Sequence, residues 1–189
     1  EVLMYREIKQ WPSACLKAEN KAVEDVASVE DLIHDLIDTC NVKMGAGLAA
    51  PQIGINKKVL VIKPKVFQTE NPDPSEYNPD YMVLINPVLE SDGEDVTWKE
   101  GCLSLEGVNT NVVRKSNTMI TYISETGEEK KLVAEWPFSG GLQHECDHLD
   151  GKLFIHRIPP RRRAFLIQRR NRKLKKIARA EKRARRALQ

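Results

Sequence analysis

The hexapeptide Gln143-His144-Glu145-Cys146-Asp147-His148 predicts more about this chain than any other segment. Its two histidines stand four residues apart, and four residues of an α-helix rotate by about 40° and rise by ~6 Å. Both imidazoles can therefore reach one metal ion, and Glu145 lies close enough to handle protons on a water bound to that ion. The spacing predicts a metal-dependent hydrolase whose metal is held by a helix.

Two helical histidines can also be ordinary core residues, so the periodicity of the segment matters. Apolar residues recur at i, i+4, i+8 and i+11 and predict a buried stripe made of Phe138, Leu142, Cys146 and Leu149. His144 and His148 project from roughly the opposite side, and we expect both rings to face a cleft. Pro137 suits a first helical turn and Gly151 a C-terminal stop, so the predicted helix covers residues 137–150.

A catalytic metal site usually takes three protein ligands and leaves one position open for water, so a third ligand is needed. The cysteines form no CxxC pair and no disulfide framework; they are Cys15, Cys40, Cys102 and Cys146. Cys102 follows a glycine in Glu100-Gly101-Cys102-Leu103-Ser104, which lets the backbone approach a ligand, and thiolate binds iron or zinc well. A lone cysteine is also often a small buried hydrophobe. Taken alone, Cys102 leaves both interpretations open.

Three segments in this order resemble the motifs of the peptide deformylases. They are Gly45-Ala46-Gly47-Leu48-Ala49-Ala50-Pro51-Gln52, the cysteine segment 100–104 and the histidine segment 143–148. The resemblance covers roughly residues 4–157. It implies removal of the N-formyl group from the initiator methionine of nascent polypeptides, with release of formate. It also implies that Cys102, His144 and His148 hold the metal, natively Fe²⁺ and replaceable by Ni²⁺, Co²⁺ or Zn²⁺.

The resemblance also implies a role for each polar group of the site. A divalent metal lowers the pKa of its bound water, which then attacks the formyl carbon. Glu145 accepts a proton from this water and delivers it to the leaving amine. By similarity, the side-chain amide of Gln52 and the backbone N–H of Leu103 stabilise the oxyanion. Each ligating histidine needs an acceptor for its other ring nitrogen, and Glu100 and Asp147 are both candidates.

Small residues are expected to bind the substrate, because a backbone without side chains can approach an extended peptide closely. They are Gly45, Ala46, Gly47, Gly101, Gly140 and Gly141. A helix C-cap after Met44 is a second role for the first glycines. Relatives usually have bulkier residues at 140 and 141, next to His144. The missing side chains either enlarge the pocket for the first substrate residue or only loosen the first helical turn. Asn109 stands where many relatives carry an arginine that contacts the peptide.

The remaining pattern predicts an α+β fold, with antiparallel or mixed β-sheets packed around the central metal-binding helix and a basic C-terminal helix. Runs rich in β-branched residues predict strands over 59–62, 82–85, 118–123 and 131–134. Residues 28–40 predict an amphipathic helix with Ser28 as N-cap and Asp31 three residues later. Proline-rich residues 67–80 predict a surface loop. We expect a catalytic domain over 1–157 and a basic helical extension over 158–189.

Charge divides the chain at Arg157. From there onward lie 15 of the 30 Lys and Arg residues and one acidic residue, Glu181, so the tail carries +14 and the preceding part −11. Clustered Lys and Arg bind nucleic acid by releasing counterions. Because bacterial deformylases can dock on ribosomes through a C-terminal helix, the resemblance implies ribosomal RNA as a partner. The alternative is a solvated or disordered charge run, and we expect a long helix only if something neutralises the charge.

Two other classes of protein share part of this pattern. A zinc endoprotease would use His144, Glu145 and His148 but would not need Cys102. A nucleic-acid-binding module with a structural metal would usually close the fourth coordination position with protein. The presence of Cys102 and Gln52, and of Glu145 beside an incomplete ligand set, disfavours both. No apolar run approaches the ~18 residues of a membrane helix. We expect a cytoplasmic protein of bacterial type, or an organellar one after removal of a transit peptide.

Overall fold

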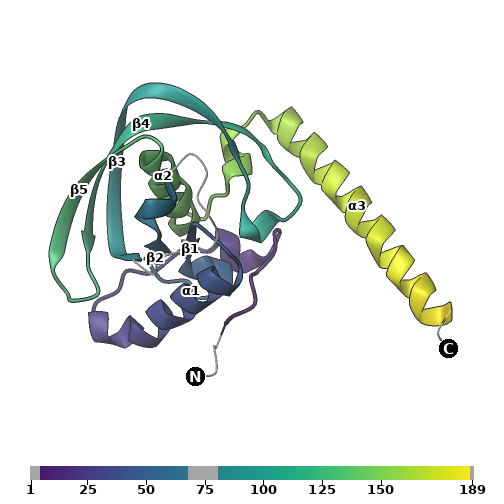
Figure 1. Ribbon diagram of the computed structural model, residues 1–189, viewed down its shortest axis with the longest axis horizontal. Helices are drawn as coiled ribbons and strands as arrows, with labels where there is room; N and C mark the ends of the chain where they lie inside the picture. Colours follow the sequence, from purple (N-terminus) through teal and green to yellow (C-terminus); the bar gives the residue numbers. More distant parts are fainter. Residues whose placement is uncertain (1–4, 68–80, 188–189) are drawn as a thin grey trace.

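The computed structural model describes residues 5–67 and 81–187, and within them one antiparallel sheet of five strands carries the fold (Figure 1). The order in the sheet, β1-β2-β3-β4-β5, follows the order in the chain. The strands are β1 (Gly47–Ala49), β2 (Val59–Ile62), β3 (Met82–Glu100), β4 (Thr110–Ile123) and β5 (Glu129–Glu135). The predicted α+β class is confirmed. Most of the loop predicted over 67–80 lies outside the described residues.

Helices pack on both faces of the first strands of the sheet. They are α1 (Glu30–Val42) and α2 (Phe138–Leu149), whereas the third helix, α3 (Pro160–Ala187), lies outside these layers. All four residues of β2 are buried, because Val59 and Val61 belong to the core beside α1 whereas Leu60 and Ile62 belong to the core beside α2. Short 3₁₀ turns complete the fold: η1 (Ala14–Lys17), η2 (Val26–Val29), η3 (Ala50–Ile53), η4 (Pro64–Phe67), η6 (Leu103–Leu105) and η7 (Phe154–Arg157).

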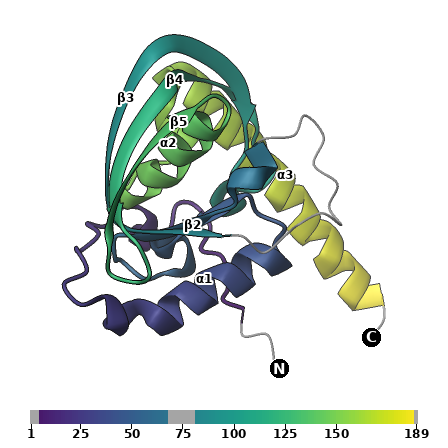
Figure 2. The same cartoon turned by 60° about the vertical axis from the view of Figure 1, so that its left-hand side comes forward.

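Helix α2 is enclosed by the curved strands β3, β4 and β5 (Figures 1 and 2). The predicted helix position is close to the observed one, but the predicted buried stripe does not describe which residues are buried. Nine of its twelve residues are buried, including Glu145 and His148, while Phe138 and Cys146 of the expected stripe are only partly buried. A helix enclosed on nearly all sides does not display the apolar stripe of a surface helix. The polar residues of α2 are therefore buried and need partners.

Strands β3 and β4 are much longer than predicted. β3 runs on to Glu100 and pairs with β4 through irregularities between Ile85 and Val88 and between Asp92 and Asp95. The polar, acidic sequence in this part of β3 faces solvent on an outer region of the sheet, where a strand needs no apolar alternation. This extension matters because it delivers Glu100 and the segment that follows it to the histidines of α2.

Both ends of α1 differ from the sequence prediction. Residues Val26–Val29 form η2, whose cap is Asp25, which accepts a hydrogen bond from the Ala27 N–H at 3.1 Å. The capping box expected at Ser28 is thus absent, and α1 begins at Glu30. At the other end Met44, with φ of 51°, takes the left-handed position, and the Gly45 N–H donates to the Cys40 carbonyl at 2.8 Å. The first glycine is not the left-handed residue of this cap.

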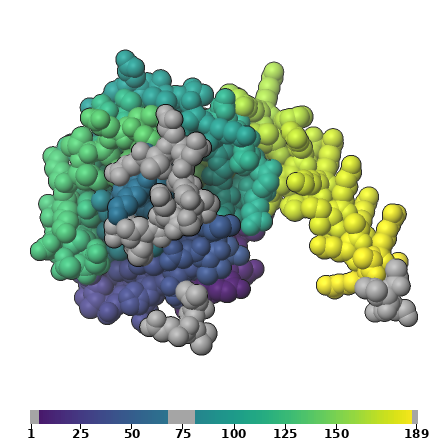
Figure 3. All heavy atoms as spheres, in the orientation of Figure 1, coloured from purple at the N-terminus to yellow at the C-terminus, as the bar shows by residue number. Residues whose placement is uncertain are grey.

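The basic tail forms one helix, α3, as the sequence predicted. Pro160 occupies its first position, and the rest is rich in Arg, Lys, Ala and Leu, which all favour helix. The helix runs from Pro160 to Ala187, and the expectation that a partner must neutralise its charge stays a prediction. Leu166 and Ile167 pack against a third core that contains Leu105, Phe154 and Ile158. Beyond this contact the helix projects away from the rest of the molecule (Figures 1 and 3).

Candidate metal centre

Cys102, His144 and His148, the three predicted ligands, lie together beside α2. Their candidate ligand atoms are all within 4.8 Å of one another, and Cys102 Sγ is 3.3 Å from Nε2 of His148. The histidines come from one helix because four residues place their rings on the same side, with ring centroids 5.2 Å apart. Cys102 comes from the loop between β3 and η6, which places a distant part of the chain beside the helix.

The chemical state of Cys102 suits a metal ligand. Burial alone would raise the pKa of the thiol, but His148 and His144 lower it to about 5, so that the thiolate predominates at neutral pH. Burial lowers the pKa of His144, but Cys102 and Glu100 raise it above its ordinary range. Neighbours that favour a proton on His144 also favour a divalent cation beside it. One thiolate and two imidazoles are a donor set that fits iron or zinc.

Glu100 is the partner that orients His144. Its Oε2 accepts a hydrogen bond from Nδ1 of His144 at 2.7 Å, which leaves Nε2 of the same ring for an ion. Burial alone would raise the pKa of Glu100, but His144 and Arg114 lower it to about 2. Glu100 is therefore an ionised acceptor. Of the two candidate acceptors left open by the sequence, the structure pairs Glu100 with His144.

Arg114 was missed by the sequence analysis, although it binds both Glu100 and Asp147, the two residues considered as acceptors for the histidines. Its Nε donates to Glu100 at 2.7 Å and its Nη1 donates to Asp147 at 2.6 Å, and the guanidinium is almost fully buried. Asp147 also accepts hydrogen bonds from Arg157 and so serves the arginines, not a histidine. Among the described residues, none hydrogen-bonds Nδ1 of His148. Arg114 lies within β4, and no local motif marks it.

Glu145 is positioned by the close approach of Gly47. A Cβ added to Gly47 would lie 2.8 Å from Cγ, Cδ and Oε1 of Glu145. Burial raises the pKa of this carboxyl, and within the described part of the chain its Oε2 has no hydrogen-bond partner. A buried carboxyl oxygen without a partner is costly unless a ligand uses it. Gly47 thus has a structural reason to be glycine, which the motif alone did not reveal.

Gln52 and Leu103 both lie next to Cys102. The Gln52 side chain is fixed at its oxygen, which accepts from the Ala49 N–H at 2.8 Å, so that its NH₂ group points toward Cys102 and Ser104. The distances from Nε2 are 3.5 Å to Cys102 Sγ and 3.3 Å to Ser104 Oγ. Leu103 begins the 3₁₀ turn η6 directly after the cysteine. Two potential hydrogen-bond donors, the side-chain NH₂ of Gln52 and the backbone N–H of Leu103, therefore lie beside Cys102, the proposed metal ligand.

A pocket of about 180 Å³ opens onto these groups. Of the small residues expected to bind substrate, all but Gly140 line it, together with Glu145 and Phe67. A side chain at Gly140 would meet the ring of Trp136 at 2.7 Å, and one at Gly141 would strike the ring of Phe67. Gly101 is covered by Asn109, whose Oδ1 occupies the place of a Cβ. Aromatic rings thus fill the space that the two helical glycines leave.

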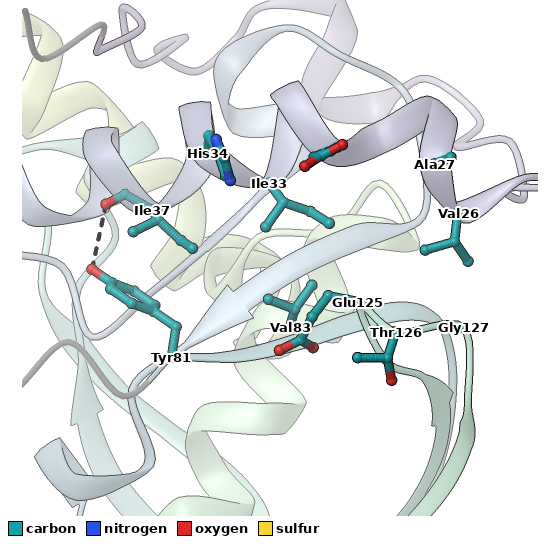
Figure 4. A pocket seen from close by; sticks show the side chains of 11 residues that line it. Val26, Ala27, Ile33, His34, Ile37, Tyr81, Val83, Glu125, Thr126 and Gly127 are labelled. Carbon is teal, nitrogen blue, oxygen red and sulfur yellow. Dashed lines mark hydrogen bonds between the residues drawn. The ribbon is translucent and has the colours of Figure 1, made fainter.

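A second, larger hollow of about 730 Å³ lies between α1 and the β4–β5 turn (Figure 4). Ile33, Ile37 and Val83 form its apolar part, and Tyr81 donates a hydrogen bond to the Ile37 carbonyl at 3.4 Å. No residue of the Cys/His/His cluster lines it. Its size therefore does not make it the catalytic pocket, since the Cys/His/His cluster and Glu145 lie elsewhere.

Comparison with known proteins agrees with this geometry. A family model described as polypeptide deformylase matches residues 5–164. The chain belongs to the polypeptide deformylase family. A peptide deformylase of Thermodesulfovibrio yellowstonii is 36% identical over 159 residues, which cover 83% of this chain and 91% of that relative. The crystal structure of a peptide deformylase from Legionella pneumophila has a TM-score of 0.78 at 32% identity, covering 95% of this chain and 99% of that one.

Other relatives are longer than this chain. "Peptide deformylase 2" of Prochlorococcus marinus is 40% identical over 132 residues, which cover 69% of this chain and 62% of that relative. Removal of the formyl group is the activity of the deformylase family, so this deformylase is a hydrolase that acts in protein biosynthesis. The family is metal-dependent, and the Cys/His/His cluster fits a metal. Among the described residues no helix is both long and apolar enough to cross a membrane.

Proposed function

We propose that Glu145 is the proton carrier of this deformylase. The observation that supports this role is its buried carboxyl, with a raised pKa and a free Oε2, in the pocket that Gly47 and His144 also line. Such a carboxyl can accept a proton from the attacking water and then donate it to the leaving nitrogen of the peptide. A raised pKa suits both halves of this task, because the proton must be taken up and then released.

The proposed oxyanion donors are the side-chain NH₂ of Gln52 and the backbone N–H of Leu103. Fixed donors stabilise the charge that develops on the formyl oxygen, and loss of one typically lowers turnover by about 10²–10³-fold. The Ala49 N–H holds the Gln52 amide in the orientation that such a donor needs. Gly45, Ala46, Gly47, Gly101 and Gly141 line the pocket and are proposed to contact the formyl-methionyl end of the substrate.

Cys102, His144 and His148 are proposed to hold Fe²⁺, with Ni²⁺, Co²⁺ or Zn²⁺ as replacements. When bound, such an ion supplies Lewis acidity to water and to the formyl oxygen. Support comes from the thiolate character of Cys102 and from the Glu100 carboxylate behind His144, which makes the ring a better donor. Metal analysis of protein purified without oxygen would test this set. Retention of the ion after Cys102→Ala would contradict the proposed role of the thiolate.

Formate release from a formyl-methionyl peptide tests the catalytic proposal directly. The wild type, loaded with iron without oxygen or with nickel, is expected to release formate. Glu145→Gln should lower turnover by about 10²–10⁴-fold at unchanged metal content. Glu135→Gln, at an exposed position of β5, is the matched control and should behave like the wild type. Cleavage of internal bonds in an unformylated peptide, or full turnover by Glu145→Gln, would refute the assignment.

We further propose that the exposed part of α3 docks on ribosomal RNA near the peptide exit, where formylated nascent chains emerge. Residues 172–186 are exposed and carry nine Lys and Arg residues and one Glu, a composition that binds phosphate backbones. Ribosome pelleting at several salt concentrations would compare the wild type with a chain lacking residues 172–189. Equal pelleting of the two proteins would refute docking. A cytoplasmic location is proposed with it and accords with bacterial relatives such as that of Picosynechococcus.

A further inference from the structure

Arg170 is the last residue of α3, within the described side chains, that is not exposed. Arg163, Leu166 and Ile167 are half-buried and Arg170 is only 9% exposed, a spacing of i, i+3, i+4 and i+7 that marks one helix face. The residues from 171 to 186 are all exposed, and the helix leaves the body at this point (Figures 1 and 3). A buried arginine at the edge of a packed helix face needs acceptors, because its charge is costly to desolvate.

The acceptors of Arg170 all belong to the catalytic body. Its Nε donates to the Glu106 carbonyl at 3.1 Å, its Nη2 donates to Oε1 of Gln10 at 3.1 Å, and its Nη1 donates to the Trp11 carbonyl at 3.5 Å. The planar guanidinium fixes the directions of these bonds in a way that a lysine could not. Arg170 therefore ties α3 to two segments at once, the N-terminal segment at Gln10 and Trp11 and the loop that follows η6.

The N-terminal segment in turn holds both proposed oxyanion donors. The Lys9 N–H donates to the Gln52 carbonyl at 2.7 Å, and the Gln10 side-chain NH₂ donates to the Leu103 carbonyl at 2.7 Å. The Trp11 N–H donates to the Ser104 carbonyl at 2.8 Å. Three consecutive residues thus fasten the glycine-rich motif to the cysteine motif. Gln10 is central, since one end of its amide contacts Leu103 and the other end contacts Arg170.

We propose that Arg170, acting through Gln10, is a positioning residue that sets the place of Leu103 in the active site. Arg170 binds the amide oxygen of Gln10 and thereby orients its NH₂ group toward Leu103. Without Arg170, the oxygen of Gln10 keeps only the Glu106 N–H at 3.4 Å among the described residues, so the amide that binds Leu103 is held by fewer hydrogen bonds. An oxyanion donor loses its effect as it leaves its required place, and a misplacement of about 1 Å can cost roughly 100-fold in rate. This inference rests on the proposed role of the Leu103 N–H.

The test uses the full-length, metal-loaded enzyme and a short formyl-methionyl peptide without ribosomes. The variants are Arg170→Ala, Gln10→Met, their combination, and Arg169→Ala as the control that removes the same charge from the exposed face one residue away. Arg170→Ala is expected to lower kcat on the order of tenfold, less than loss of a donor itself, with KM within about twofold and metal content unchanged. Gln10→Met should lower kcat similarly, and Arg169→Ala should match the wild type.

Non-additivity is the readout that a merely structural role would not produce. If the two residues act as one relay, the combined variant should lose no more kcat than the more impaired single variant. Multiplied losses, a change confined to KM, or equal losses in Arg170→Ala and Arg169→Ala would overturn the relay. If Arg170→Ala does not fold, Gln10→Met alone decides, and wild-type kcat in that variant overturns the proposal. A wild type without formate release would instead refute the proposed function.

Discussion

Gly47→Ala should impair catalysis through a single added carbon. The new Cβ would lie 2.8 Å from three atoms of the Glu145 side chain, whereas non-bonded carbons pack at about 3.5–4.0 Å. The carboxyl must therefore move by about 1 Å, because Gly47 is held in the sheet by its pairing with Ile62 and has little freedom to retreat. The direction of this movement is away from the pocket wall that Gly47 forms.

A displacement of about 1 Å at a reacting group costs roughly 100-fold in rate, or about 2.7 kcal/mol of barrier. The same substitution removes backbone freedom from the unfolded chain, which favours the folded state by about 0.5–1 kcal/mol. We therefore expect kcat for formate release to fall about 100-fold, with intact metal content and little change in the free energy of unfolding. Steady-state kinetics on a formyl-methionyl peptide and guanidinium denaturation would measure the two quantities.

Gly45→Ala is the matched control for this experiment. Its Cβ would meet Cys40 Sγ at 3.1 Å and Leu103 Cδ1 at 3.2 Å, contacts that need a shift of only a few tenths of an ångström and that spare Glu145. Its kcat should fall much less than that of Gly47→Ala, because the displacement is smaller and Glu145 stays in place. Full activity of Gly47→Ala, or equal losses in the two variants, would show that the approach of Gly47 does not position Glu145.

Three further predictions follow from buried groups. Arg114→Met should lower the free energy of unfolding by about 3–5 kcal/mol, because it leaves Glu100 and Asp147 buried without their shared cation. Lys115→Met, which removes a half-exposed cation, should change the same quantity by less than about 1 kcal/mol in the same denaturation assay. Burial raises the pKa of the Cys40 thiol to about 11 from 9.0, so the folded state holds the proton more tightly than the unfolded state, and the resulting stability is present below about pH 9 and is lost as the pH rises to 11. Between these pH values the free energy of unfolding of the wild type should fall by about 1.4 kcal/mol per pH unit more than that of Cys40→Ala. Equal pH dependence of the two proteins in denaturation experiments would contradict this. Gly141→Ile should displace the Phe67 ring and change the ratio of kcat/KM between formyl peptides with different first residues, whereas an unchanged ratio would remove the pocket hypothesis.

Local spacing made part of the site predictable from the sequence. The two histidines and Glu145 share one helix, so their mutual arrangement follows from helical geometry alone. Cys102 could be joined to them only through the resemblance, because the chain between residues 102 and 144 includes two strands whose pairing sets the distance. Arg114 could not be predicted at all. Its partners Glu100 and Asp147 lie on β3 and α2, and a buried cation in a strand leaves no periodic signal.

The misjudged features of the fold have a common physical cause, since in each case a tertiary contact overrides a local preference. Ser28 is a better helix cap than Val29, yet η2 places Asp25 as the capping residue and delays α1 to Glu30. The acidic stretch of β3 has little strand propensity but pairs with β4 on both sides of the irregularity between Asp92 and Asp95. The polar side of α2 was expected to face a cleft, and His144 and Glu145 do line a pocket, but the curved sheet covers most of the other polar residues of the helix.

Two buried arginines support the site from different directions, and their environments explain their different roles. Arg114 binds two carboxylates behind His144, so its removal leaves uncompensated charge and should mainly affect stability and metal affinity. Arg170 binds only neutral acceptors, namely two carbonyls and an amide. Its removal leaves no buried charge behind, and the lost hydrogen bonds are modest in energy. A large effect of Arg170→Ala on turnover would therefore come from the geometry at Leu103. For this reason kcat, and not thermal stability, distinguishes a residue that positions Leu103 from one that only attaches α3 to the catalytic body.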